Sequence, residues 1–300
     1  MKIIERNVQQ IGKSFLITLP KGWIKALGVK KGASLKIMTN EQGNLSIAPD
    51  FIHASKHTEA IITFGEHFRR EFFKEYFSQR EKIIIRLEKD ISNKNKSDIY
   101  SFLSRFMNVQ VIEESAQAII VKSFVIQELS IEECLKRMHL LSLNMLDEVK
   151  QSTQEADIQE IRNTMTRFYY MLIMQVRRFL SEGIFTESNQ ISIIRALDVR
   201  MAAEKMQRIG ELLSSLAMID KDVQSLLIDF DVYYTQAGRC FLESNFEKAL
   251  PLWNHGNNLQ NKLNKIIYRT SRRKETEAYG QLIIVSQMIR LAKEISMLVR

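Results

Sequence analysis

The chain has 300 residues, of which 45% are hydrophobic and only three are proline. This length allows two or three domains, and the composition provides hydrophobic cores and favours long, uninterrupted helices. The two cysteines exclude a disulfide framework, and the formal net charge of +8 at pH 7 favours acidic partners.

The first 50 residues predict four short strands and one short helix, which form the first domain, residues 1–50. An extended run ends at Gly12, and Pro20 and Gly28 bracket a helix of about two turns. Further strands are predicted near residues 15–19, 34–38 and 45–48. Because so small a unit buries too little of its surface to fold alone, a partner chain is expected.

The segment from Arg6 to Ala48 resembles the AbrB/SpoVT family of swapped-hairpin DNA-binding domains through its Gly-Lys-Ser-Phe-Leu-Ile-Thr-Leu-Pro core and Lys-Gly turn. The resemblance implies a homodimer with interleaved strands, and it places DNA contacts at Arg6, Lys13 and Lys25. Eight basic residues against three acidic ones in residues 1–50 suit phosphate contacts. Family members often carry a second basic residue where this chain has Ile24. The alternative is that these lysines form a solvated face of a dimerisation module.

Residues 51–126 predict a small α/β module that connects and orients the two ends of the chain. Its strands are expected near residues 60–63, 82–87, 109–113 and 117–122. The aromatic residues Phe64, Phe68, Phe72 and Tyr76 recur every fourth position, which indicates one buried helix face rather than a platform for nucleobases. A second helix is expected to begin at Ser97 or Asp98.

From residue 127 onward the pattern is helical, and short connections between long helices predict an antiparallel bundle. Ser130 and Glu133 form a capping-box signature at the first helix. Further helices are expected near residues 157–181, 191–218, 246–269 and 275–300, and one more runs from after a turn at residues 220–222 to about residue 243. The third helix is expected to turn Ile194, Leu197 and Met201 inward. No membrane-spanning segment or signal peptide is expected, which favours a cytoplasmic protein.

The bundle resembles the PhoU family, because Gln207-Arg208-Ile209-Gly210-Glu211 is similar to that family's Glu-Arg-Ile-Gly-Asp motif. A weaker copy around Arg290 predicts two three-helix repeats, residues 127–220 and 221–300. An AbrB-like head joined to a PhoU-like bundle is a domain arrangement known from archaea. The resemblance therefore implies a regulator of phosphate uptake.

PhoU family members can bind divalent metals through a Glu and an Asp four positions apart, on one helix face. Here Gln207 replaces the first acid and Glu211 keeps the second, while the repeat carries Ile289 and Lys293 at the matching positions. We therefore expect no cofactor, with Glu211 as the weak remaining candidate for a divalent metal. Glu204 is expected to pair with Arg208 instead.

Nothing in the sequence indicates an enzyme. Cys134 and His139 share a helix and are interpreted as packing residues, and His53 and His57 lie in an expected linker. Glycine-rich phosphate loops are absent. The sequence thus predicts a cytoplasmic, dimeric, DNA-binding regulator of phosphate uptake, with an adaptor that restrains a phosphate transporter or sensor kinase as the alternative. An antitoxin-like protein is disfavoured by the long bundle.

Overall fold

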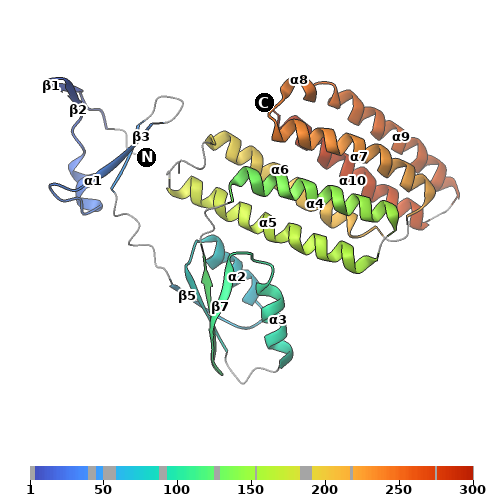
Figure 1. The fold of residues 1–300 in the computed structure, drawn as a ribbon, viewed down its shortest axis with the longest axis horizontal. Helices are drawn as coiled ribbons and strands as arrows, with labels where there is room; N and C mark the ends of the chain where they lie inside the picture. Colours follow the sequence, from blue (N-terminus) through green and yellow to red (C-terminus); the bar gives the residue numbers. More distant parts are fainter. Residues whose placement is uncertain are drawn as a thin grey trace. The chain divides into compact units, whose positions relative to one another are not determined.

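The computed structural model contains a small β-rich N-terminal unit followed by a mostly helical body (Figure 1). The chain divides into two compact units, Met1–Thr58 and Glu59–Arg300. The residues that the structure describes are 4–39, 45–49, 59–87, 93–124, 129–152, 154–182, 191–216, 219–273 and 276–299. The predicted linker histidines lie outside these ranges.

The N-terminal unit contains two antiparallel strand pairs and one short helix. Its elements are β1 (Gln9–Ile11), β2 (Ser14–Leu16), α1 (Lys21–Ala26), β3 (Leu35–Thr39) and β4 (Leu45–Pro49), with β1 paired to β2 and β3 paired to β4. Gly12 turns the first hairpin with φ of 62°, and Gly28 follows α1 with φ of 63°, a region that glycine enters without steric cost. The predicted helix is confirmed, whereas the second strand ends at Leu16 instead of reaching Leu19.

The α/β module is built on a four-stranded mixed sheet with the order β5-β6-β8-β7. The strands are β5 (Glu59–Thr63), β6 (Lys82–Arg86), β7 (Val109–Glu114) and β8 (Ala118–Ser123), and the helices are α2 (Phe68–Phe77) and α3 (Asn93–Leu103). The predicted strands are confirmed, and the aromatic stripe is part of the core, because Phe68, Phe72 and Tyr76 are buried. α3 begins at Asn93, so the prediction of a start at Ser97 or Asp98 is wrong.

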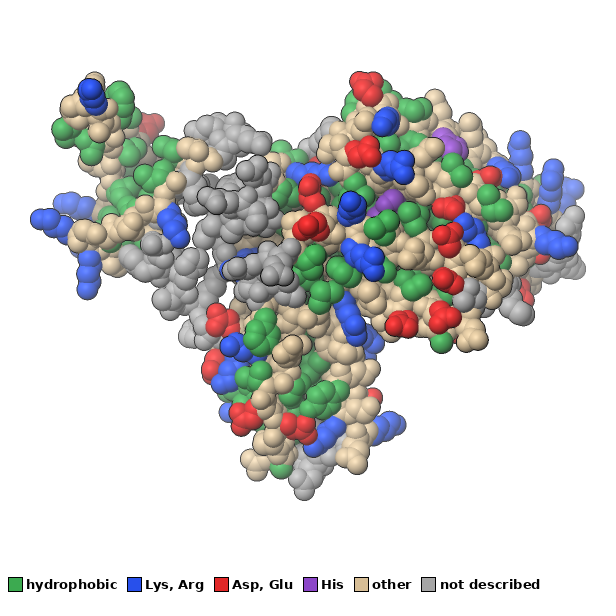
Figure 2. All heavy atoms as spheres, in the orientation of Figure 1, with side chains coloured by type: hydrophobic (Ala, Val, Ile, Leu, Met, Phe, Trp, Pro, Cys, Tyr) green, Lys and Arg blue, Asp and Glu red, His purple; other side chains and the backbone are tan. Residues whose placement is uncertain are grey.

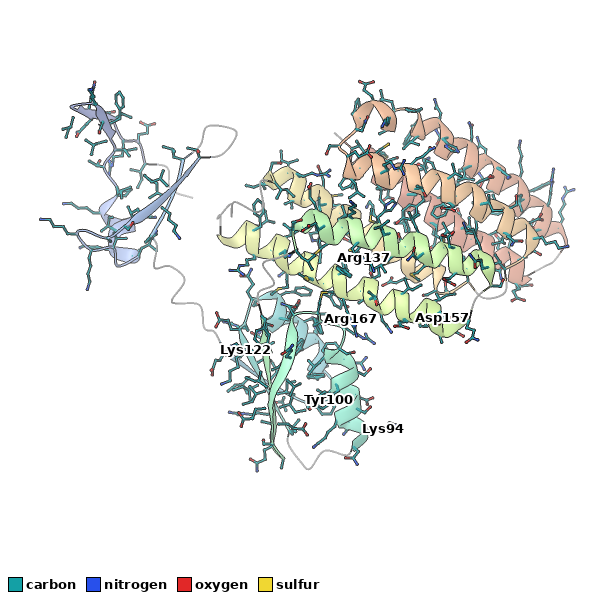
Figure 3. All side chains as sticks on the ribbon, in the orientation of Figure 1. Lys94, Tyr100, Lys122, Arg137, Asp157 and Arg167 are labelled. Carbon is teal, nitrogen blue, oxygen red and sulfur yellow. The ribbon has the colours of Figure 1, made fainter. Side chains whose placement is uncertain are left out.

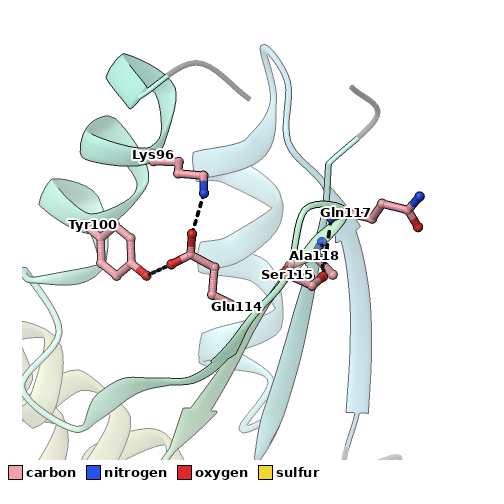
Figure 4. A network of polar contacts seen from close by, with 6 residues as sticks. All are labelled: Lys96, Tyr100, Glu114, Ser115, Gln117 and Ala118. Carbon is pink, nitrogen blue, oxygen red and sulfur yellow. Dashed lines mark hydrogen bonds and ion pairs between the residues drawn. The ribbon is translucent and has the colours of Figure 1, made fainter. Parts of the chain in front are cut away.

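Polar contacts fasten α3 to the edge strand β7 (Figure 4). The carboxylate of Glu114 accepts hydrogen bonds from Lys96 Nζ at 2.6 Å and from the hydroxyl of Tyr100. These donors hold the pKa of Glu114 below its usual range, Lys96 contributing most. The β7–β8 turn follows at once, where Ser115 Oγ accepts the backbone N–H of Ala118 at 3.0 Å. The end of β7 is therefore fixed on two sides.

Six long helices form the bundle: α4 (Ile131–Gln151), α5 (Glu155–Glu182), α6 (Ile193–Leu213), α7 (Lys221–Leu242), α9 (Leu252–Arg273) and α10 (Thr276–Met297). α4, α5 and α6 contact one another, as do α7, α9 and α10. α4 also contacts α7, and α6 also contacts α10 (Figure 1). None of the helices within the described ranges is long and apolar enough to cross a membrane.

The start of α4 is set by the predicted capping box, which is confirmed. Ser130 Oγ accepts the backbone N–H of Glu133 at 3.1 Å, and the Glu133 carboxylate accepts the backbone N–H of Ser130 at 2.7 Å. The two side chains thus satisfy two N–H groups that a helix start leaves unpaired.

Two helical predictions are wrong. The helix expected over residues 246–269 is divided at Pro251 into α8 (Phe246–Ala249) and α9, because proline lacks an N–H and clashes with the preceding turn. On α6, Ile194, Leu197 and Met201 are exposed rather than turned inward. The neighbours α4, α5 and α10 cover other faces of that helix, which bury Val199, Ala203 and similar small residues.

The α/β module is attached to the middle of α5. The ring of Tyr170 stacks on Phe106 with centroids 5.1 Å apart and meets the edge of Phe73 at 5.2 Å. One turn earlier, Arg167 Nε donates to the backbone oxygen of Ser104 at 2.7 Å (Figure 3). Aromatic and polar contacts together therefore join the module to the bundle.

Arg195, near the start of α6, links three helices. Its Nη2 donates to the backbone oxygen of Phe241 at 2.9 Å, its Nε lies 3.3 Å from Glu132 Oε1, and its guanidinium lies 4.3 Å from the centroid of the Phe241 ring. The Arg195 side chain is only 18% exposed, whereas that of Glu132 is 55% exposed, so the contact with Phe241 is the better shielded from solvent. Arg195 consequently holds the end of α7 against α4 and α6.

We expect Arg195→Met to lower the free energy of unfolding by about 2 kcal/mol, because it removes a charge-assisted hydrogen bond, an ion pair and a cation–π contact. Urea denaturation followed by circular dichroism measures this loss. Arg137→Met is the matched control: Arg137 is exposed on α4 and forms no polar contact with a described residue (Figure 3). Equal losses in the two variants would contradict the structural role of Arg195.

Candidate functional site

The three predicted DNA-contacting residues lie on different elements of the N-terminal unit. Arg6 precedes β1, Lys13 follows Gly12 in the β1–β2 turn, and Lys25 lies in the last turn of α1. All three side chains are exposed, and none forms an ion pair with a residue that the structure describes. Their charges are therefore available to phosphate groups, which supply most of the affinity in protein–DNA contacts.

The same unit exposes large hydrophobic side chains. Phe15 is 72% exposed and Ile11 is 66% exposed, and both belong to the β1–β2 hairpin. Figure 2 shows hydrophobic side chains on the surface of the N-terminal unit. Further exposed members are Ile4, Val8, Leu16, Ile17, Ile37 and Leu45. Among the side chains between positions 4 and 49 whose burial the structure describes, only Pro49 is buried. The described side chains of this unit thus form no hydrophobic core, and exposed apolar surface of this kind marks interaction sites.

The position on α6 at which Gln207 replaces the first acid of the metal-binding pair holds a hydrogen-bonded amide. Gln207 is buried, and its Nε2 donates to Thr166 Oγ1 of α5 at 3.0 Å. Glu211, four positions later, is exposed. Among the described residues, no three His, Cys, Asp or Glu side chains gather where they could hold a metal ion. Glu211 stays the weak candidate for a divalent metal that it was in the sequence.

The matching position on α10 is occupied by a lysine. Lys293 Nζ donates to Asn257 Oδ1 of α9 at 2.6 Å and lies 4.7 Å from the centroid of the Trp253 ring. Ile289, at the other position of the motif, is fully buried. A fixed ammonium group and an aliphatic side chain cannot ligate a hard cation. These side chains instead connect α9 to α10.

The ion pair predicted between Glu204 and Arg208 is wrong. Glu204 Oε2 lies 3.8 Å from Nη1 of Arg200. Glu204 therefore pairs with the arginine one turn before it on α6, and not with Arg208 one turn after it. The two alternatives have the same four-residue spacing, so the sequence pattern does not distinguish them.

Cys134 and His139 are packing residues of α4, as predicted. Cys134 Sγ lies 3.6 Å from Gln175 Oε1, and burial raises the pKa of its thiol to about 12. Burial also lowers the pKa of His139 to about 4, so its imidazole is neutral at pH 7. A thiol with so high a pKa carries almost no thiolate, which is the reactive form.

Sequence reasoning missed a cavity of about 700 Å³ between α4 and α7. Lys136 and His139 line it from α4, and Arg239 lines it from α7. Lys136 and His139 are three positions apart and share a helix face. Arg239 joins them only because α4 packs against α7, and no local sequence pattern signals that contact.

No protein-family model, curated protein or solved structure matches the chain. The two family resemblances therefore rest on the residues that carry them. These are the Gly12–Pro20 core of the N-terminal unit and the Gln207–Glu211 segment of α6.

Proposed function

We propose that this chain is a homodimeric DNA-binding regulator of phosphate uptake, in which an AbrB-like swapped-hairpin head is joined to a PhoU-like bundle. The observation that carries the proposal is a head that exposes both apolar strands and basic residues and buries almost nothing. A second copy would cover side chains such as Phe15 and Ile11, and two interleaved hairpins would complete one core.

In the dimer, each head offers Arg6, Lys13 and Lys25 to the DNA backbone. Three cations from each copy correspond to about six neutralised phosphates, which is enough for affinity that depends strongly on salt. These contacts position the head, while groups near them select the sequence.

The pairing of the bundle helices supports two PhoU-like repeats. Each helix triplet makes the same contacts internally, and the first and third helices of one triplet contact their counterparts in the other. Met206 and Met288 are fully buried at matching positions, and Arg208 and Arg290 are exposed at matching positions. Because the PhoU resemblance implies phosphate control, we assign sensing or docking to the bundle. An effector that binds one arrangement of the heads more tightly than the other would shift the protein toward that arrangement. The difference between its two affinities sets how far DNA binding can change.

This proposal is tested by measuring the DNA affinity of the intact protein over a range of salt concentrations. One duplex carries promoter DNA of phosphate-transport genes, and the other carries the same bases in scrambled order. We expect tight, sequence-preferring binding with a log–log salt slope near −5, as about six phosphate contacts require. Replacing Arg6, Lys13 and Lys25 together by Ala should remove most of this slope, since each lost phosphate contact reduces it by about 1.

The matched control removes three exposed cations from the other unit: Lys94, Lys122 and Arg137, each replaced by Ala (Figure 3). Its net charge changes by the same amount, so an equal loss of DNA affinity would show that total charge, and not the head, governs binding. Light scattering on both triple variants confirms that they remain dimers.

The alternative is an adaptor whose head only dimerises and whose bundle restrains a phosphate transporter or sensor kinase. Ile194, Leu197 and Met201 favour it, because they form an exposed apolar stripe along α6. Weak DNA binding without sequence preference, together with an intact dimer, would support the adaptor. Replacing this stripe by Ser should then abolish partner binding.

A further inference from the structure

The cavity between α4 and α7 has the dimensions of a small-molecule site. Its volume of about 700 Å³ lies within the range that binds metabolites and drug-sized ligands. Leu140 and Leu143 of α4 and Leu242 of α7 supply apolar lining. Lys136 and Arg239 bring one positive charge from each helix.

The acidic groups around this cavity already have partners. Glu132 pairs with Arg195 at 3.3 Å, Glu133 accepts the backbone N–H of Ser130 at 2.7 Å, and Glu243 lies 3.8 Å from Lys248. By contrast, Lys136 and Arg239 form no ion pair with a described residue. Lys136 contributes only weakly to lowering the pKa of Glu133, for which the bonds from Ser130 are the main cause. The cavity therefore offers unpaired positive charge.

A buried imidazole forms part of the lining. His139 is 4% exposed, and its Nε2 has no hydrogen-bond partner among the described residues. The centroids of the His139 and Tyr234 rings lie 5.2 Å apart in an edge-on arrangement. The His139 ring also occupies the space that a Cβ at position 238 would need, which is free because residue 238 is glycine. Nε2 faces Gly238, so the imidazole closes the floor of the cavity by packing against α7.

We propose that this cavity binds a small organic anion with an apolar body. Its acidic group would lie between Lys136 and Arg239, and its apolar part would contact Leu140, Leu143 and Leu242. The proposal depends only on contacts within the bundle, so it is independent of dimerisation and of DNA binding.

Two probes that differ by one charged group test the site in the full-length protein. The first, 8-anilinonaphthalene-1-sulfonate, joins an apolar body to a sulfonate, and the second, N-phenyl-1-naphthylamine, has the same body without it. We expect Lys136→Gln and Arg239→Gln each to weaken binding of the sulfonate about tenfold, as the loss of a charge-assisted contact requires. Binding of the neutral probe should stay unchanged in both variants.

Arg137→Gln is the control, because it removes a neighbouring exposed charge of α4 that does not line the cavity. The sulfonate should also shift the imidazole NMR signals of His139, which binding elsewhere on the protein would not do. Glutamine keeps much of the aliphatic stem, and both cations are exposed, so the variants should fold. The proposal would be overturned if the variant with both Lys136→Gln and Arg239→Gln bound the sulfonate as tightly as the wild-type chain. It would also be overturned if Arg137→Gln weakened this binding as much as the cavity variants do.

Discussion

Replacing Gly238 by Ala is expected to lower the free energy of unfolding of the bundle by about 3 kcal/mol. A Cβ at this position of α7 would lie 2.1 Å from Nε2 and 2.4 Å from Cε1 of His139. The imidazole is buried against Tyr234, so it moves only if α4 and α7 separate. Overpacking of this kind costs about 1–3 kcal/mol, and this contact falls at the upper end. Urea denaturation followed by circular dichroism measures the loss.

Two further variants separate this clash from a general effect of Gly→Ala. Gly280→Ala on α10 should raise stability by about 0.5–1 kcal/mol, because a Cβ there meets nothing within 4 Å and alanine favours the helix. His139→Ala combined with Gly238→Ala should recover most of the lost stability, since it removes the opposing ring. If Gly238→Ala and Gly280→Ala raised the free energy of unfolding by similar amounts, this result would contradict the close packing of His139 against Gly238.

Features fixed by neighbouring residues could be predicted from the sequence. The Ser130–Glu133 capping box depends on two side chains three positions apart, and Gly28 ends α1 through its own backbone conformation. The aromatic stripe through Phe72 also follows from helical spacing alone, because most of its rings lie on one face. In each case the decisive interaction lies within about one helical turn.

Features that depend on which helices meet could not be predicted. The apolar spacing of Leu197 and Met201 matches a buried face, yet both side chains are exposed, because the described helices that contact α6 cover its other faces. The cavity is a similar case, since Lys136 and Arg239 come together only through the packing of α4 on α7. The break at Pro251 had a local signal, the missing N–H of proline, which the helical pattern around it outweighed.

Replacing Phe72 by Ala is expected to destabilise the α/β module by about 3–5 kcal/mol, the usual cost of removing a buried aromatic side chain. Phe72 is fully buried at the centre of an aromatic cluster. Its ring lies 5.4 Å from Phe102 and 5.1 Å from Phe106. Hydrogen exchange measured by mass spectrometry should show lost protection in peptides from residues 59–87 and 93–124.

Phe64→Ala is the matched control, because Phe64 is half-buried at the edge of the same cluster and contacts Phe68. Phe64→Ala should lower the free energy of unfolding by about 1 kcal/mol, in proportion to the smaller area that Phe64 buries.

The hydrogen-exchange protection of the bundle helices in Phe72→Ala shows how the module is coupled to the bundle. If Phe72→Ala leaves α4 and α7 protected, the module unfolds separately and the contacts of Tyr170 act as a docking surface. If those helices lose protection equally, the contacts of Tyr170 join the module and the bundle into one cooperative unit.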